Sequence, residues 1–160
     1  MYSNILIPID IRDEKTWRMG LPVALNLAVT TNARVHVITV IPDYLLSGDY
    51  PNIAIDSIVS EAKSKLEEIV MQNNTANARV TLGVERGGIT SEVLRVAREL
   101  PAELIVMTSH RPQIKDYVMG SNAGHIVLHA PCSVHVVREA GGHQAAAFMA
   151  QDIVRRPNAA

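Results

Sequence analysis

Aromatic residues are scarce in this chain: among 160 residues there are one Trp, four Tyr and one Phe, or 4%. Any core must therefore be built from aliphatic side chains, and the hydrophobic share of 48% excludes a disordered chain. Aliphatic runs without aromatics are typical of a parallel sheet that is buried on both faces. The length fits one domain and leaves little room for two.

Cysteine is nearly absent, and neither charge sign dominates. The single Cys132 excludes an intramolecular disulfide framework and gives no indication of an oxidising compartment. With 15 Lys and Arg residues against 16 Asp and Glu residues, the formal net charge is −1. A chain without a global positive field is not expected to bind nucleic acid indiscriminately.

Signals for export and for membrane insertion are also missing. Charged residues begin at Asp10, too early for the apolar core of a signal peptide. Residues 117–137 contain no Asp, Glu, Lys or Arg and are long enough to span a bilayer. They also contain Gly, Asn, His and Pro, which favour a buried turn, helix and strand. We therefore expect a cytoplasmic protein with no membrane partner.

Short aliphatic runs alternate with helical patterns, which predicts repeated βαβ units and a doubly wound α/β sheet. Strands are predicted at residues 4–9, 34–41, 78–84, 104–107 and 133–138. Helices are predicted at 16–31, at 57–72, from an N-cap at Thr90 to Pro101, and at 120–130. Loops are expected at 42–52 and 85–88. We expect residues 1–138 to form the domain and 139–160 a C-terminal tail, frayed or a short helix.

A ligand site is expected at the carboxyl ends of the strands, where the winding direction reverses. Asp10 follows the first strand, residues 108–111 follow the fourth, and Gly120 precedes the last helix. The free N–H groups of that helix start favour an anion, and glycine lets a phosphate approach closely. The Asp10 carboxylate can accept hydrogen bonds from ribose hydroxyls. Each signal alone is common in turns and caps, but their convergence predicts a nucleotide.

The sequence resembles the universal stress protein family over residues 2–138. The matching stretches are residues 5–10 (Ile-Leu-Ile-Pro-Ile-Asp), 109–110, 120–121 and 129–134. Residues 109–112 and 117–122 resemble the small single-domain enterobacterial branch, whose members bind ATP. The resemblance implies a homodimer and a five-stranded parallel, Rossmann-like sheet (adenine nucleotide alpha hydrolase-like) with strand order 3-2-1-4-5.

By position, the resemblance also implies ATP or another adenine nucleotide as ligand, with Mg²⁺ as a candidate companion ion. The residues carried over to the ligand are Pro8, Ile9, Asp10, Val40, Met107, Thr108, Ser109, His110, Arg111, Gly120, Ser121 and Asn122. ATP-binding members have two glycines in the loop after strand four, replaced here by Thr108 and Arg111. Their glycine pair is followed by nine residues, whereas eight separate Arg111 from Gly120. We expect a reshaped phosphate loop, with Arg111 either a phosphate ligand or an exposed loop residue.

Three functions follow from these observations. The leading one is a dimeric stress-response protein that binds ATP with little or no turnover. The alternative is an enzyme that slowly hydrolyses ATP or phosphorylates or adenylylates itself through Ser109, Ser121 or His110. A receiver-like signalling domain ranks last, because Glu85 and Arg138 stand near the places where such a domain has an acceptor Asp and a Lys.

Two further predictions concern the fifth strand and the side chains of His and Cys. An edge strand offers unpaired backbone groups and apolar side chains, so a homodimer is expected to form there. That strand comprises Ser133, Val134, His135, Val136 and Val137.

His125 and His129 have the i, i+4 spacing of metal ligands but no evident third ligand, so no metal site is expected. His36 and His135 are expected to be structural, and Cys132 has no base partner that would make it a nucleophile.

Overall fold

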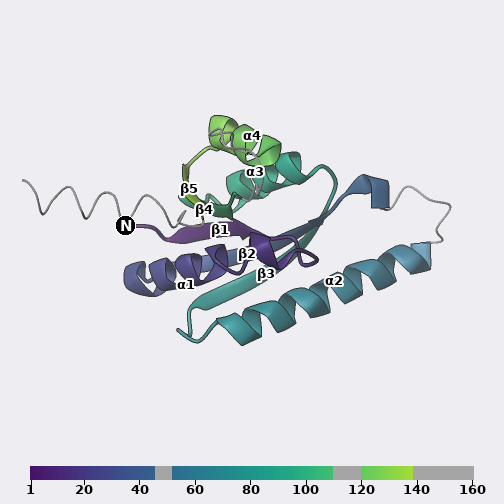
Figure 1. Cartoon of the computed structure of the whole chain (residues 1–160), viewed down its shortest axis with the longest axis horizontal. Helices are drawn as coiled ribbons and strands as arrows, with labels where there is room; N and C mark the ends of the chain where they lie inside the picture. Colours follow the sequence, from purple (N-terminus) through teal and green to yellow (C-terminus); the bar gives the residue numbers. More distant parts are fainter. Residues whose placement is uncertain (46–51, 110–119, 139–160) are drawn as a thin grey trace, which may run out of the picture.

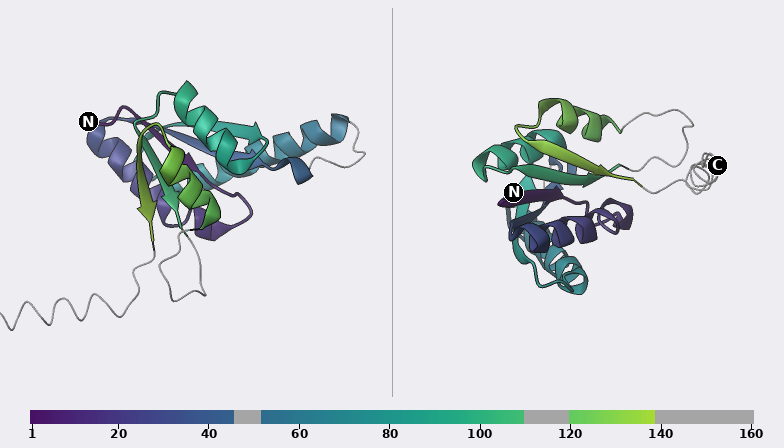
Figure 2. Two further views of the ribbon diagram at one scale, coloured as in Figure 1. Left: turned by 90° about the horizontal axis from the view of Figure 1, so that it is seen from above. Right: turned by 90° about the vertical axis from the view of Figure 1, so that its left-hand side faces the viewer.

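Five parallel strands form one sheet between two layers of helices (Figures 1 and 2). The structure is a computed structural model, which describes residues 1–45, 52–109 and 120–138. The strand order is β3-β2-β1-β4-β5, as predicted. The strands are β1 (Asn4–Pro8), β2 (Arg34–Ile41), β3 (Arg79–Arg86), β4 (Leu104–Thr108) and β5 (Ser133–Val137).

The helices divide evenly between the two faces of the sheet. On one face lie α1 (Gly20–Thr31) and α2 (Asn52–Asn73), and on the other α3 (Ile89–Glu99) and α4 (Ser121–His129) (Figure 1). Two short 3-10 helices, η1 (Glu14–Thr16) and η2 (Asp43–Leu45), follow β1 and β2. The fold is therefore a doubly wound α/β sheet, and β1 lies at its centre.

The central strand β1 is buried on both faces. Ile5, Leu6 and Ile7 have no exposed surface, and β1 pairs in parallel with β2 on one side and β4 on the other. Successive side chains of a strand point to opposite faces, so a strand covered on both sides is a continuous apolar run. Burial of each such side chain stabilises the fold by about 1.5–3 kcal/mol.

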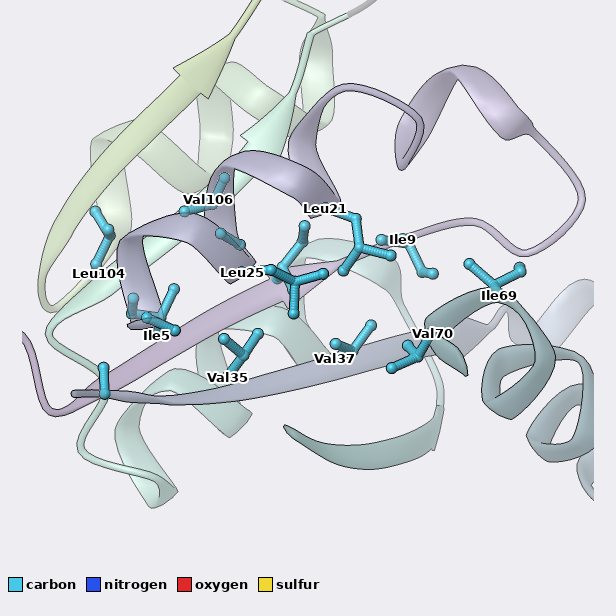
Figure 3. Packing of buried hydrophobic residues seen from close by; sticks show 14 of the residues in the cluster. Ile5, Ile9, Leu21, Leu25, Val35, Val37, Ile69, Val70, Leu104 and Val106 are labelled. Atoms are coloured by element: carbon cyan, nitrogen blue, oxygen red, sulfur yellow. The ribbon is translucent and has the colours of Figure 1, made fainter. Parts of the chain in front are cut away.

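Each helix layer packs on its own cluster of aliphatic side chains. Leu21 and Leu25 of α1 lie over Ile5, Val35 and Val37, and α2 adds side chains from its C-terminal half to the same cluster (Figure 3). On the opposite face, side chains of α3 and α4 pack against β1, β2 and β4. The strand residues in this cluster are Leu6, Ile38, Ile105 and Met107, and the helix residues are Val93, Val96 and Ile126. The core contains no buried Phe or Tyr among the described residues.

The predicted start of α3 is wrong. The helix begins at Ile89, and its N-cap is Gly88 rather than Thr90. Gly88 has extended backbone angles (φ −71°, ψ 131°), and its carbonyl accepts the N–H of Glu92 at 2.9 Å. The Ser91 hydroxyl donates to the same carbonyl at 2.8 Å. Thr90 therefore lies inside the first turn.

Larger differences from prediction concern the end of β3 and the starts of α2 and α1. β3 extends through Glu85 and Arg86, because these residues pair with the end of β2. The turn is consequently limited to Gly87 and Gly88, and Gly87 has a φ of 137°, which favours glycine. α2 begins at Asn52 rather than at residue 57, and α1 begins at Gly20 rather than at residue 16. Thr16 belongs to η1 instead.

Some predictions fall outside the described residues. These include the two loop residues His110 and Arg111 and the tail 139–160. Within the ranges that the structure describes, no helix combines the length and the apolar character needed to cross a membrane.

His36 of β2 is buried between two polar side chains. Its Nδ1 lies 2.5 Å from the Thr81 hydroxyl on β3, and its Nε2 lies 3.4 Å from Asn4 Oδ1 on β1. Only 8% of its surface is exposed. This burial, and secondarily the positive charge of Arg34, lowers the pKa of His36. His36 is thus a structural residue, as predicted.

The lowered pKa of His36 predicts a pH-dependent stability. The unfolded chain binds a proton on this side chain more readily than the folded protein. The contribution of His36 is therefore fully present above pH ~6.5 and declines as the pH falls below it. Urea denaturation at about pH 7.5 and about pH 5.5 should show this decline, and His36→Gln should reduce it. An NMR titration that gives the folded protein a His36 pKa at or above the ordinary value would contradict the assignment.

Candidate functional site

A cavity of about 200 Å³ lies where the carboxyl ends of β1 and β4 diverge, and we call it the switch-point cavity. Its position is the predicted one, because the chain winds in opposite directions from β1. Seven of the residues predicted to border a nucleotide line it. They are Pro8, Ile9, Asp10, Val40, Met107, Thr108 and Asn122. Its wall is therefore aliphatic on one side and polar on the other.

Three more predicted residues lie at the edge of this region but do not line the cavity. Ser109 follows β4, and its backbone N–H donates to the Val137 carbonyl at 3.1 Å. Gly120 is the N-cap of α4, and Ser121 is the first, exposed residue of that helix. The remaining two predicted residues, His110 and Arg111, lie outside the described part of the chain.

Sequence reasoning missed Arg12, which lines the switch-point cavity and pairs with Asp10. The Asp10 carboxylate accepts hydrogen bonds from Arg12 Nε at 3.2 Å, from Arg12 Nη2 at 3.3 Å and from the Arg12 backbone N–H at 2.9 Å. The hydrogen bond and charge of Asp10 raise the pKa of Arg12. Both side chains are about half exposed, so the pair stabilises the fold by at most about 1 kcal/mol. A ligand hydroxyl can replace Arg12 on Asp10 at little cost.

The loop that carries Asp10 is held by Thr16. The Thr16 hydroxyl accepts the Asp10 N–H at 2.9 Å and lies 2.8 Å from the Asp13 carbonyl. Asp13 in turn N-caps η1 by accepting the Lys15 N–H at 3.1 Å. These local bonds fix the position of Asp10 at the mouth of the cavity. Thr16, Ile89, Val93 and Ile126 are further lining residues that the sequence analysis did not identify.

Gly120 occupies a position that does not require glycine for folding. Its backbone angles (φ −52°, ψ 148°) are open to any residue. A Cβ added there would meet nothing within 4 Å among the described atoms. Neither its conformation nor packing against the described residues therefore explains this glycine. It leaves the first turn of α4, whose N–H groups face outward from the helix end, open to a ligand.

Thr108 is packed tightly against the start of α1. A Cβ added to Gly20 would lie 2.6 Å from Thr108 Oγ1, too close for any real contact. Thr108 Oγ1 is buried, and no described residue hydrogen-bonds to it. Gly20 is therefore needed because Thr108 occupies the space beside it. Thr108, which was expected in the loop after the fourth strand, is the last residue of β4, and a glycine on the neighbouring helix leaves room for its side chain.

A second and larger cavity of about 600 Å³ adjoins the first, and we call it the α2 cavity. It lies between the end of β2 and the middle of α2. Its lining residues are Asp10, Ile11, Arg12, Thr39, Val40, Ile41, Pro42, Ile58, Glu61, Ala62, Ser64, Lys65 and Glu68. Asp10, Arg12 and Val40 border both cavities. The two cavities are thus neighbouring chambers with one shared wall.

Among the described residues, the histidine and cysteine side chains outside the two cavities form no evident reactive centre. The rings of His125 and His129 lie 4.4 Å apart on α4. In residues 1–45, 52–109 and 120–138, no group of three or more His, Cys, Asp or Glu side chains is arranged to hold a metal ion. Burial raises the pKa of the Cys132 thiol, which disfavours the reactive thiolate.

The sheet order and the cavity at its reversal point define a doubly wound, Rossmann-like α/β protein with a cavity at the switch point. The model of the universal stress protein family matches residues 1–138, and the chain belongs to this family. Universal stress protein G of Escherichia coli O157:H7 is 27% identical over 144 residues, which cover 86% of this chain and all of that protein.

Solved structures of the same family share the fold. Universal stress protein UspA from Lactobacillus plantarum is 26% identical, with a TM-score of 0.62 over 86% of this chain and 98% of that one. A universal stress protein from Archaeoglobus fulgidus in complex with dAMP has a TM-score of 0.55 at 20% identity, over 84% of this chain and 97% of that one. A universal stress protein in complex with cAMP has a TM-score of 0.57 at 18% identity, over 86% and 97%.

The contact between Gly20 and Thr108 predicts a coupled effect on stability. Gly20→Ala should lower the free energy of unfolding by about 1–3 kcal/mol, because the added methyl group overpacks the site. Adding Thr108→Ala should restore much of this loss by removing the hydroxyl that the methyl group meets. Chemical denaturation of both single variants and the double variant measures the coupling.

The matched control is Gly124→Ala in α4, where an added Cβ meets nothing within 4 Å among the described residues. This change should raise the free energy of unfolding by up to about 1 kcal/mol, because alanine favours a helix more than glycine does. If Gly20→Ala were equally destabilising with and without Thr108→Ala, the contact would not be the cause.

Proposed function

We propose that this protein is a cytoplasmic stress-response protein that binds ATP, or another adenine nucleotide, in the switch-point cavity with little or no turnover. The observation that carries the proposal is the convergence of β1, β2, β4 and α4 on one cavity at the reversal point of the sheet. Ligands of open α/β sheets bind at this point. The nucleotide complexes of two similar family structures support the same ligand class.

The chemistry of the cavity wall orients the proposed nucleotide. The adenine ring would lie against the aliphatic side chains of Ile9, Val40 and Met107, since no described aromatic residue lines this cavity. The ribose hydroxyls would donate to Asp10 in place of Arg12. The phosphates would lie beside Gly120 and Ser121 at the start of α4, where backbone N–H groups and the helix dipole favour negative charge.

The phosphate end of the proposed site has four further residues. Asn122 lines the cavity, Ser109 lies beside it, and His110 and Arg111 fall outside the described residues. The family resemblance supports all four as neighbours of the ribose and phosphates. A Mg²⁺ ion would be held mainly by the phosphates and water, because magnesium retains several waters in such sites. The Arg12 guanidinium lies close enough to Asp10 to remain near the ribose after exchange.

Titration calorimetry with ATP tests the proposal. The wild-type protein should bind, and Gly120→Val should weaken binding at least about tenfold, since its side chain occupies the space that phosphate requires. The same variant should keep the wild-type free energy of unfolding, because its Cβ meets no described atom within 4 Å. Asp10→Ala should also weaken binding and should reduce any preference for ATP over dATP.

Gly124→Ala is the matched control, because it changes a glycine of the same helix that lines neither cavity. It should bind ATP as the wild type does. Absence of heat and of any competition with a fluorescent adenine nucleotide up to millimolar ATP would overturn the proposal. Intact mass after incubation with ATP separates simple binding from self-modification.

We also propose that two copies pair through the exposed edge of β5. Among the described strands, β5 pairs with β4 alone, and its Val134 and Val136 side chains are half-buried while Ser133 and His135 are exposed. A second copy would cover the open backbone groups of the strand and the side chains of Val134 and Val136, whereas Val137 at the strand end is already buried in the core. Light scattering should give a dimer mass that Val136→Lys reduces toward the monomer, and a wild-type monomer at high concentration would contradict the pairing.

A further inference from the structure

The α2 cavity has no role in the nucleotide site as proposed so far. Its volume of about 600 Å³ lies within the range of about 300–1,000 Å³ that is usual for pockets of small-molecule ligands. The switch-point cavity, at about 200 Å³, lies below that range. A nucleotide in the switch-point cavity therefore leaves the larger α2 cavity unfilled.

Val40 lies between the two cavities. It lines both of them, as do Asp10 and Arg12. In the proposed orientation the phosphates point away from Val40 toward α4, and the adenine ring lies against Val40. A group attached to the far edge of the purine would therefore pass Val40 and enter the α2 cavity. Figure 1 shows that α2 begins beyond the carboxyl ends of the strands and runs back along the sheet, and residues of this helix between Ile58 and Glu68 line the α2 cavity.

The interior of the α2 cavity is aliphatic. Ile11, Ile41, Pro42, Ile58 and Ala62 form its walls, and Ala62 is only 5% exposed. Transfer of an uncharged apolar group from water onto such a surface is favourable by about 25 cal/mol per Å² of area buried. The walls thus fit an alkyl or aryl group of moderate size.

The charged rim disfavours an anionic group. Two cations, Arg12 and Lys65, face three carboxylates, those of Asp10, Glu61 and Glu68. Both cations are already engaged, since Arg12 pairs with Asp10 and Lys65 Nζ lies 2.7 Å from Glu68 Oε2. The formal charge of this rim is 2 − 3 = −1. A second phosphate would meet net repulsion here, whereas a neutral group would not.

We propose that the switch-point cavity and the α2 cavity together accept adenine nucleotides that carry an apolar substituent on the exocyclic N6 amine, with the substituent in the α2 cavity. The ribose is attached to the purine on the side that faces Asp10, and N6 is the substitutable amine on the distal edge. This inference rests on the proposed nucleotide site and names the ligand class more narrowly. No charged contact to the substituent is required.

N⁶-benzyl-ATP is the probe, and the readout is the ratio of its affinity to that of ATP in each protein variant. The wild type should bind the benzyl compound about tenfold more tightly than ATP. Ala62→Phe fills the cavity from α2 and should bring the ratio to about one. Ile58→Trp tests the same cavity from the preceding turn of the helix, in case Ala62→Phe does not fold. Ser60→Phe is the matched control, because Ser60 is exposed on α2 and does not line the cavity.

The outcomes are distinguishable. Equal or weaker binding of N⁶-benzyl-ATP to the wild type overturns this inference while leaving ATP binding intact. A tighter complex whose ratio is unchanged in folded Ala62→Phe and Ile58→Trp also overturns it, since the substituent then lies elsewhere. If neither nucleotide binds, the proposed function itself fails. Thermal melting of each variant establishes that it is folded.

Discussion

Burial of β1 on both faces is the constraint on which the rest of the structure depends. Ile5, Leu6 and Ile7 are fully enclosed, which requires a helix layer on each side and a hydrogen-bonded strand at each edge. The chain meets this requirement by winding in one direction through β2 and β3 and in the other through β4 and β5. The same reversal separates the loops after β1 and β4 and so opens the switch-point cavity. The site is thus a geometric consequence of how the central strand is buried.

The chemistry around that cavity depends on a few side chains of this chain. Thr108 stands where ATP-binding relatives are expected to have a glycine, and Gly20 on α1 provides the space that its side chain needs. Arg12 pairs with Asp10 at the mouth of the cavity through an exposed and weak ion pair. Because that pair is formally neutral, the start of α4 is the local source of positive potential that the proposal uses, in a chain with a net charge of −1.

Features set by local apolar patterns were predictable from the sequence, and features set by strand pairing and packing were not. The aliphatic runs around Ile5 and Val106 identified the central strands, and Asp10 was placed correctly because it directly follows one of them. Glu85 was assigned to a turn, although pairing with Val40 makes it part of β3. Arg12 was missed because its role depends on a loop geometry held by Thr16. The α2 cavity depends on how α2 is spaced from the end of β2, which no sequence pattern reports.

The central claim is that an adenine nucleotide occupies the cavity between the ends of β1, β2 and β4. Methyl NMR of the full chain, labelled at Ile, Val, Met and Thr and titrated with ATP, tests this claim most directly. The account predicts saturable shifts at Ile9, Val40, Met107 and Thr108, with methyl groups near the opposite end of the sheet, such as Val35, unchanged. Saturable shifts confined to other surfaces, or no shifts at millimolar ATP, would contradict it.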